Sequence, residues 1–366
     1  MKNTFGTSVA VTICGESHGE AITVVIDGLA PGIPVDRAFI DAQLTLRRPA
    51  GKISTARQEP DEYRILSGVF EGKTTGTPIC IMIPNTQTRS KDYSATRALA
   101  RPGHADYTAF CKYHGFEDYR GGGHFSGRIT AGLVAAGAVA LTALAGKGIH
   151  IGTHIARCGG ICDRAFGDLE SDIQALSKMP FAVLDGKAAE TMLARMEAIA
   201  AEGDSIGGLL ETAVTGMPAG VGEPWFDTVE GILSHALFSI PAIKGVQFGD
   251  AFDLIDAKGS EYNDPFRMEN GKVQPVTNHN GGINGGITNG APIAFRCAVK
   301  PTPSIYKEQD TVDFFRQENA KLQIQGRHDP AIIHRARVVV DSVTALVLCD
   351  ILAGRFGTDW LGCPSV

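Results

Sequence analysis

The sequence predicts an α+β fold built as one domain. Segments with the residue pattern of β-strands and segments with helical periodicity both occur along the chain. No low-complexity segment or break in composition divides them, so we expect a single domain over residues 1–366. The composition, 43% hydrophobic and 20% charged, is that of an ordinary soluble globular protein.

The expected elements follow from local periodicity and from helix-ending residues. Runs rich in β-branched residues predict strands at Val9–Cys14, Ala21–Asp27, Arg64–Phe70, Ile79–Ile83, Leu209–Val214, Ile293–Val299 and Arg337–Val340. Helical patterns occur at Asp36–Arg47, Arg128–Ala145, Ala188–Ala201 and Asp341–Phe356. Pro49 follows the first helix and Gly203 the third, and both residue types end helices.

One stretch has no charged residue from Ile129 to Gly146. Its length meets the threshold for a membrane span, but Ala and Gly dominate it and large apolar residues are few. We therefore expect a buried helix packed closely against its neighbours, and no membrane partner.

The charge distribution predicts a small anionic ligand. A net charge of −6 argues against a nucleic-acid partner, which selects basic surfaces. Arginines nevertheless gather in short stretches, at Arg47 and Arg48, Arg97 and Arg101, Arg120 and Arg128, and Arg327, Arg335 and Arg337. Local arginine clusters in an acidic protein indicate a pocket for a polyanion.

Cysteine usage and the N-terminus predict a cytoplasmic protein. The eight cysteines lack the density of a secreted disulfide scaffold. The first residues lack the pattern of a signal peptide, because a strand-like segment begins almost at once.

A faint internal repeat runs through the chain. Gly15-Glu-Ser-His-Gly19 and Gly203-Asp-Ser-Ile-Gly207 are separated by 188 residues, and at the same offset Gly28 matches Gly216 and Gly32 matches Gly220. Each copy reads as a turn, a strand and a second turn, which suggests an internal duplication. His18 is replaced by Ile206, so the turn can be structural while His18 has a more specific role.

Three motifs suggest other functions and have plainer interpretations. Gly15–Gly19 fits the G-x-S-x-G elbow of serine hydrolases, but a strand rather than the required helix follows Ser17. The stretch 68–74 is one residue short of a P-loop, and we interpret it as a β-turn. His150, His154, Cys158 and Cys162 recur every four residues without a C-x₂-C pair, so we expect structural roles and no metal.

Three further stretches combine the groups that an acid–base site for an anion requires. Residues 101–107 contain Arg101, His104 and Asp106, residues 118–128 contain a glycine run followed by a helix, and residues 326–330 contain Arg327 and Asp329. Glycines let the backbone approach a ligand, and the first N–H groups of a helix bind anions. Together the three stretches supply cations, titratable histidines and a carboxylate base.

These stretches belong to an ordered series of motifs that resembles the chorismate synthase family over nearly the whole chain. The series contains GESHG, Val25-Ile-Asp-Gly-Leu-Ala-Pro-Gly, Arg47-Arg48-Pro49, Glu59-Pro60-Asp61, Leu66–Gly72, Ser90-Lys-Asp-Tyr-Ser, RPGHADYT, Gly203-Asp-Ser, Gly222-Glu-Pro, Asn278-His-Asn-Gly-Gly, Lys300-Pro-Thr-Pro-Ser and GRHDP. The resemblance implies a mixed β-α-β sandwich, a homotetramer, and a 1,4-elimination of phosphate from 5-enolpyruvylshikimate 3-phosphate that gives chorismate. It also implies reduced FMN as cofactor, and NADPH in bifunctional relatives; whether this chain is bifunctional stays open.

The resemblance also implies roles for individual residues. His18 would give a proton toward the leaving phosphate, His104 would protonate the reduced flavin, and Asp329 would assist removal of the ring hydrogen. Arg47, Arg48, Arg128 and Arg335 would bind the anionic groups of the substrate, with Arg47 also at the NADPH position. Flavin contacts would come from His124, Ser126, Ala242, Gly285, Lys300, Thr302, Ser304 and Arg327.

The sequence departs from the common family pattern near the expected flavin site. His124-Phe125 stands where many relatives have Arg-Ser, and Pro241 replaces an Asn. Elsewhere, Lys52 stands near a position that Arg often occupies in the family, and Asp341 replaces a Glu in the C-terminal signature. His124 could bind phosphate when it is protonated, but its charge would depend on pH, whereas the charge of an arginine does not.

Two functions of other classes remain as alternatives. A serine hydrolase would use Ser17 with a histidine, and a serine-directed fluorophosphonate would label it. A flavin- or phosphometabolite-binding protein would bind both ligands without turnover.

Overall fold

The structure, a computed structural model, describes residues 2–49, 53–54, 60–86, 97–324 and 329–362. Two five-stranded antiparallel sheets form its framework. The first sheet contains, in spatial order, β1 (Thr4–Phe5), β2 (Ala10–Cys14), β3 (Ala21–Asp27), β7 (Ile79–Pro84) and β4 (Arg64–Ser67). The second contains β11 (Ile243–Phe248), β16 (Ile293–Val299), β10 (Gly208–Thr215), β8 (His150–Cys158) and β9 (Ile161–Cys162).

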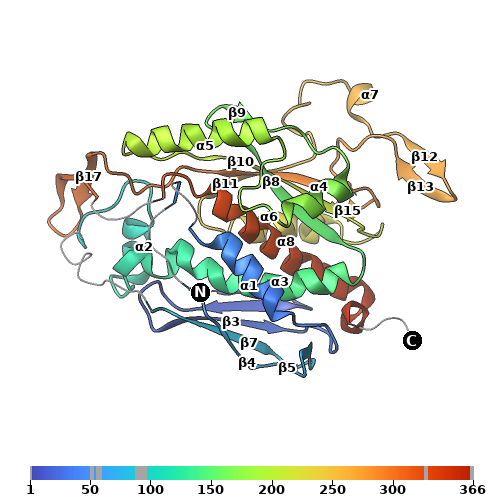
Figure 1. The fold of residues 1–366 in the computed structure, drawn as a ribbon, viewed down its shortest axis with the longest axis horizontal. Helices are drawn as coiled ribbons and strands as arrows, with labels where there is room; N and C mark the ends of the chain where they lie inside the picture. The colour runs from blue at the N-terminus through green and yellow to red at the C-terminus, as the bar shows by residue number, and fades with distance from the viewer. Residues whose placement is uncertain (1, 50–52, 55–59, 87–96, 325–328, 363–366) are drawn as a thin grey trace.

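Helices fill the layer between the two sheets. They are α1 (Arg37–Arg47), α3 (Thr130–Ala145), α6 (Val229–Leu237) and α8 (Ile333–Phe356). Figure 1 shows the first sheet at the bottom, this helical layer in the middle and the second sheet above it. The arrangement is a β-α-β sandwich with its core between the sheets.

Shorter helices and two-stranded hairpins lie outside the two sheets and the helical layer. The other described helices are α2 (Asp106–Tyr113), α4 (Leu169–Leu176), α5 (Gly186–Ala201), α7 (Gly259–Tyr262), and the 3₁₀ turns η2 (Arg120–Phe125), η3 (Gly127–Ile129), η4 (Trp225–Asp227) and η5 (Thr358–Leu361). Two-stranded hairpins are β5 (Val69–Phe70) with β6 (Lys73–Thr74), β12 (Phe266–Glu269) with β13 (Lys272–Pro275), β14 (Ile283–Asn284) with β15 (Ile287–Thr288), and β17 (Gln309–Asp313) with β18 (Glu318–Leu322).

Helices α3 and α8 pack unusually closely at the centre of the molecule. A Cβ atom at Gly137 of α3 would lie 2.2 Å from the Cβ of Ser342 on α8, so only glycine fits there. Among the described residues, Gly127–Ala145 is the stretch long and apolar enough to cross a membrane, and 78% of its most apolar window is buried inside the protein. The expectation of a buried, closely packed helix is confirmed.

Most predicted elements are confirmed, and one is wrong. The strand expected at Arg337–Val340 lies inside α8, which begins at Ile333 rather than at Asp341. Val338, Val339 and Val340 are all buried. Valine disfavours a helix only weakly, and burial on all sides of α8 outweighs that preference.

The two halves of the chain repeat the same structure. β3 and β10 each follow one of the two glycine turns, and Gly28 and Gly216, 188 residues apart, have φ angles of 84° and 79°. On one side, β3 pairs with β2 and β10 pairs with β8, each an earlier strand of the same sheet. On the other side, β3 pairs with β7 and β10 pairs with β16, each a strand that follows a hairpin.

One threonine in each half holds the turn after that strand in the same way. Thr74 Oγ1 donates to the carbonyl of Ala30 at 2.6 Å and accepts from the N–H of Ile33 at 2.9 Å. Thr288 Oγ1 donates to the carbonyl of Pro218 at 2.6 Å and accepts from the N–H of Val221 at 3.0 Å. Equivalent hydrogen bonds at equivalent positions support the internal duplication that the glycine spacing suggested.

The stretch 68–74 is the hairpin β5–β6 and not a phosphate-binding loop. Glu71 and Gly72 both have positive φ, 47° and 73°, as the two central residues of a tight hairpin turn require. The prediction of a β-turn is confirmed.

Candidate active site

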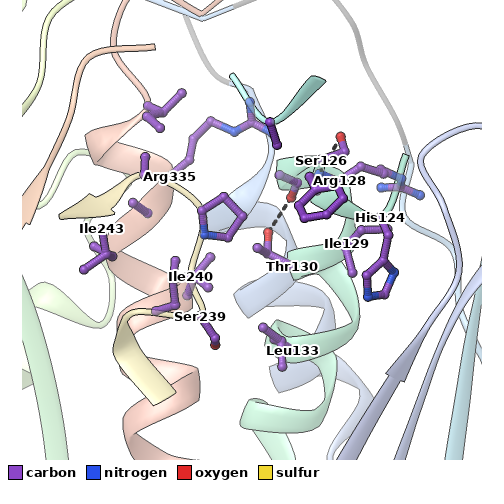
Figure 2. Close-up of a pocket in the computed structure, with 18 of the residues that line it drawn as sticks. His124, Ser126, Arg128, Ile129, Thr130, Leu133, Ser239, Ile240, Ile243 and Arg335 are labelled. Atoms are coloured by element: carbon purple, nitrogen blue, oxygen red, sulfur yellow. Dashed lines mark hydrogen bonds between the residues drawn. The ribbon is translucent and has the colours of Figure 1, made fainter. Parts of the chain in front are cut away.

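A cavity of about 1030 Å³ opens at one end of the helical layer. Its wall contains residues from the first turns of α3 and α8, from the end of α1, and from the segment 235–244 at the end of α6. Figure 2 shows Arg128 and Arg335 at one end of this space, and Leu133, Ser239 and Ile240 at the other. Because the N-termini of two long helices face the cavity, their dipoles favour a negatively charged ligand.

Three arginines of the cavity converge on one carboxylate, Asp61. Arg47 Nη2 donates to Asp61 Oδ2 at 2.9 Å, and Arg128 Nη1 donates to Oδ1. Arg48 Nε lies 3.8 Å from Oδ2. The Asp61 side chain is fully buried. Its backbone has a φ of 50°, a left-handed conformation that is unfavourable for residues other than glycine.

The electrostatics of this cluster favour an anionic ligand. Burial alone would raise the pKa of Asp61, but Arg47 and Arg128 outweigh it and hold that pKa below its usual value. Burial, with the neighbouring Arg335 and Arg128, lowers the pKa of Arg47 to about 10 despite the attraction of Asp61. Asp61 and Arg47 therefore both stay charged near neutral pH, and one carboxylate balances only part of the positive charge of the cluster.

Asp329 and Arg335 form a second ion pair in the same wall. Arg335 Nη1 donates to Asp329 Oδ2, and Arg335 Nε donates to the carbonyl of Arg47 at 2.7 Å. The second contact joins the start of α8 to the end of α1. The cavity thus brings together all four arginines that the resemblance assigned to the substrate.

His104 lines the cavity at the start of α2. Its Nδ1 atom lies 2.8 Å from Asp106 Oδ1, and Asp106 is held in turn by a two-pronged pair with Arg101. A Cβ atom at Gly122 would lie 3.2 Å from His104 Nε2, so the glycine loop passes close to that nitrogen.

His18 lies directly behind the glycine loop rather than on the cavity wall. Its side chain is nearly buried, and a Cβ atom at Gly121, which does line the cavity, would lie 2.3 Å from His18 Cε1. Gly121 has a φ of 60°. A single glycine therefore separates His18 from the cavity.

The residues expected to contact flavin divide into three groups. His124, Ser126, Ala242, Lys300, Thr302 and Ser304 all line the cavity. Gly285 does not: it lies in the turn of β14–β15, whose Gly286 packs on Thr228 at the start of α6, whereas the cavity contacts the end of that helix. Arg327 lies outside the described residues.

The substituted residue His124 and the neighbour of substituted Pro241 both have defined conformations. His124 Nδ1 donates to the carbonyl of Gly15 at 2.7 Å, which ties the glycine loop to the GESHG turn. Ala242, next to Pro241, has a φ of 77°, and its carbonyl accepts from the N–H of Lys300. A strained alanine held in place by a neighbouring segment is typical of a functional site.

Neither the hydrolase motif nor the His/Cys series has the geometry of its alternative function. Ser17 is buried, and β3 rather than a helix follows it, so the nucleophile elbow is absent from this turn. His154 lies within β8 and contacts two carboxylates, with Nδ1 2.7 Å from Asp163 and Nε2 3.0 Å from Glu211. This pairing gives His154 the structural role that was expected.

Sequence reasoning missed two polar residues that organise the site. Asp61 appeared only as part of a motif, and its burial among arginines depends on the tertiary structure. Asn85 was not singled out: its Nδ2 donates to the carbonyls of Glu16 and Gly19, and its Oδ1 accepts from Arg128 Nε. The position of Asn85 directly after β7 was the one signal available.

The fold and the cavity define an enzyme-like class: a β-α-β sandwich whose cavity has a cluster of arginines beside acid–base groups. Comparison with known proteins narrows this class. The family model for chorismate synthase matches residues 9–353. The chorismate synthases of Methanosarcina mazei and Dehalococcoides mccartyi are 47% and 45% identical, the former over 95% of both chains and the latter over 98%.

A crystal structure of chorismate synthase has the same fold, with a TM-score of 0.76, 28% identity, and coverage of 97% of this chain and 94% of that one. The chain therefore belongs to the chorismate synthase family. It is a lyase, and its reaction is the elimination of phosphate from 5-enolpyruvylshikimate 3-phosphate to give chorismate.

Proposed function

We propose that this elimination takes place in the described cavity, with reduced FMN as cofactor. The observation that carries the proposal is the gathering of four guanidinium groups, from Arg47, Arg48, Arg128 and Arg335, in one wall. The substrate has two carboxylates and a phosphate, and guanidinium groups bind both in a two-pronged geometry. The dipoles of α3 and α8 add to this attraction.

The residues present fit a flavin. A volume of about 1030 Å³ is at the upper end for one ligand and leaves room for a substrate beside a cofactor. Ser126, Lys300, Thr302 and Ser304 offer polar contacts, and Ile240 and Ile243 offer apolar ones. Reduced flavin, when bound, supplies the electron density that loss of an unactivated ring hydrogen requires.

The chain's own groups supply charge and protons. In the reaction the C–O bond to phosphate and the C6–H bond break, and the ring gains a double bond without net oxidation. The arginines stabilise the charge that develops on the leaving phosphate. His104 holds a proton toward the cavity, Asp329 accepts one at its carboxylate, and His18 assists the leaving group from behind Gly121.

The decisive experiment is an anaerobic assay with purified protein, photoreduced FMN and 5-enolpyruvylshikimate 3-phosphate. Chorismate and phosphate should appear in equal amounts, and only when the flavin is reduced. Oxidised FMN with NADPH tests bifunctionality, because turnover would then require the chain to reduce its own flavin. Flavin binding without either product would overturn the proposal and support a binding protein; labelling of Ser17 by a fluorophosphonate would support a hydrolase.

We also propose that the chain assembles as a homotetramer in the cytoplasm. The hairpin β12–β13 projects from the sandwich (Figure 1). Phe266 pairs with Pro275 and Met268 with Val273, so these four share one face of the hairpin, and Phe266, Met268 and Val273 are exposed. An exposed apolar face on a projecting hairpin supports contact with a second copy of the chain.

Light scattering tests this assembly. The parent chain should have the mass of four copies, and a variant with Phe266→Ser and Met268→Ser should give smaller species. A matched variant with Arg267→Ser and Glu269→Ser changes the opposite face and should keep the parent mass. A monomeric parent would refute the tetramer.

A further inference from the structure

We propose that Asp106, held in place by Arg101, is the positioning residue that sets the tautomer of His104. It keeps the hydrogen of the neutral ring on Nδ1, so that Nε2 is the nitrogen that exchanges a proton with the ligand. The inference rests on the proposed role of the cavity, and it adds two residues to which the family resemblance gave no role. His104 is the group that acts; Asp106 and Arg101 act through it.

Asp106 is fixed by a complete set of donors. Arg101 Nε donates to Oδ2 at 2.7 Å, Arg101 Nη2 donates to Oδ1 at 2.6 Å, and the backbone N–H of Arg101 donates to Oδ2 at 3.0 Å. Burial alone would raise the pKa of Asp106, but these contacts and His104 outweigh it and hold the pKa far below its usual range. The carboxylate is therefore ionised and can only accept hydrogen bonds.

An ionised Asp106 determines the tautomer of His104. Its Oδ1 lies 2.8 Å from His104 Nδ1, and since Oδ1 can only accept, Nδ1 carries the hydrogen. Arg101 Nη2 lies 3.0 Å from the same nitrogen and has a second hydrogen, but a bare Nδ1 would place its lone pair 2.8 Å from the Asp106 carboxylate, which the negative charge disfavours. Neutral His104 thus presents a bare Nε2, and the imidazolium presents Nε2–H.

Nε2 is the ring nitrogen of His104 that the described chain leaves for a ligand. Among the described residues Nε2 makes no hydrogen bond, whereas Nδ1 has two partners. Lys300 Nζ donates to the carbonyl of Gly103, which ties the loop before His104 to a segment that lines the cavity. Gly122 lets the opposite loop pass Nε2 without a side chain in between.

A fixed tautomer matters because a histidine exchanges protons at one nitrogen at a time. If Nδ1 lost its hydrogen, Nε2 would carry it in the neutral ring, and the ring could no longer accept a proton on the cavity side. The carboxylate also stabilises the imidazolium that forms when Nε2 is protonated. In serine proteases a buried aspartate performs the same two tasks for the catalytic histidine.

The test is Asp106→Asn, which keeps the shape of the side chain but removes its charge and lets an amide N–H face Nδ1. In the free protein, at a pH where imidazole is neutral, ¹⁵N NMR should show hydrogen on Nδ1 of His104 in the parent and on Nε2 in the variant. With reduced FMN, kcat should fall about 10²- to 10⁴-fold, whereas KM for the substrate should change less than about threefold.

Asp172→Asn is the matched control. Asp172 forms the same two-pronged pair with Arg164, at 2.9 and 2.6 Å, and lies outside the cavity wall. Its replacement should leave both the His104 tautomer and kcat at parental values. Arg101→Lys is a second variant. It keeps the positive charge but loses the two-pronged contact with Asp106, so His104 should show a mixture of the two tautomers.

The NMR measurement in the free protein separates this inference from the proposed function. An unchanged tautomer in Asp106→Asn would overturn the positioning role even if the enzyme is active. A changed tautomer in a parent chain without turnover would uphold the positioning role and reject the proposed function alone. In an active parent, a kcat loss in Asp106→Asn no larger than in Asp172→Asn would also overturn the positioning role of Asp106.

Discussion

Asp61 Oδ2 accepts a hydrogen bond from Arg47 Nη2 at 2.9 Å in a wall where both side chains are almost completely buried. The other oxygen of Asp61 accepts from Arg128, so one carboxylate holds two guanidinium groups apart and aligned. Without it, two buried cations would face each other. The arginines that we propose bind the substrate therefore depend on an acidic residue for their arrangement.

Asp61→Asn should lower the free energy of unfolding by about 3 to 5 kcal/mol, because it leaves buried cations without their partner. Urea unfolding measures the change. Asp204→Asn is the control: Asp204 pairs with Lys307 at 2.7 Å on the surface, so its loss should cost less than about 1 kcal/mol. Equal small effects would show that the buried cluster does not stabilise the fold.

The contribution of Asp61 should also depend on pH in a defined direction. Its pKa is lowered in the folded chain, chiefly by Arg47 and Arg128 acting against burial. A lowered pKa gives stability that is present above the unfolded pKa and is lost as pH falls through the folded value. The stability difference between the parent and Asp61→Asn should therefore be constant from about pH 5 upward and shrink below about pH 4.

Gly121→Ala should disturb His18 as well as the backbone. A methyl group there would lie 2.3 Å from His18 Cε1, and the φ of 60° is unfavourable for alanine. Gly148→Ala has a similar φ of 72° with nothing within 4 Å, so it measures the backbone strain alone, about 1 to 2 kcal/mol. Gly121→Ala should cost more in urea unfolding and reduce turnover, whereas Gly148→Ala should retain turnover.

Thr74→Val and Thr288→Val should have similar effects, because the two hydroxyls make the same pair of backbone hydrogen bonds. Each replacement leaves a buried N–H unsatisfied, together with a carbonyl that is buried at Ala30 and half-buried at Pro218, at about 1 to 3 kcal/mol. Thr75→Val is the control, since its hydroxyl is exposed and contacts Thr77. A large effect in one half alone would contradict the equivalence of the two turns.

Asp341 should make stability fall as pH rises toward neutrality. Burial raises its pKa to about 6, although Arg337 and Thr153 oppose the shift. A raised pKa gives stability that is present below the unfolded pKa, about 4, and is lost as pH rises through about 6. Compared with Asp341→Asn, the parent should lose about 1 to 3 kcal/mol between pH 4 and pH 7 in urea unfolding. A pH-independent difference would contradict the raised pKa.

Local sequence was a reliable guide where local forces dominate. Ala21–Asp27 and Ile293–Val299 are strands with the predicted bounds, because their apolar residues suit a buried sheet. Asp36 caps α1 by accepting from the N–H of Ala38 at 2.8 Å, which places the start of that helix within one residue of the prediction. The valines of α8 led to the wrong prediction of a strand. Their helical conformation depends on packing against other helices of the central layer, and a short stretch of sequence does not reveal that packing.

The order of motifs by itself determined the family, and the glycine spacing determined the repeat, because turns with positive φ tolerate few residues other than glycine. The arginines, His104 and Asp329 were also identifiable from residue type and motif. Only the tertiary structure decided that Asp61 sits among the arginines, that Arg101 and Asp106 orient His104, that His18 lies behind Gly121, and that Gly285 is outside the cavity. Arg128 and Asp61, like Gly121 and His18, lie far apart in the sequence, so only the packing of distant segments fixes their distances. Arg101, His104 and Asp106 are close in sequence, but their contacts depend on a backbone turn and side-chain conformations that residue type alone does not specify.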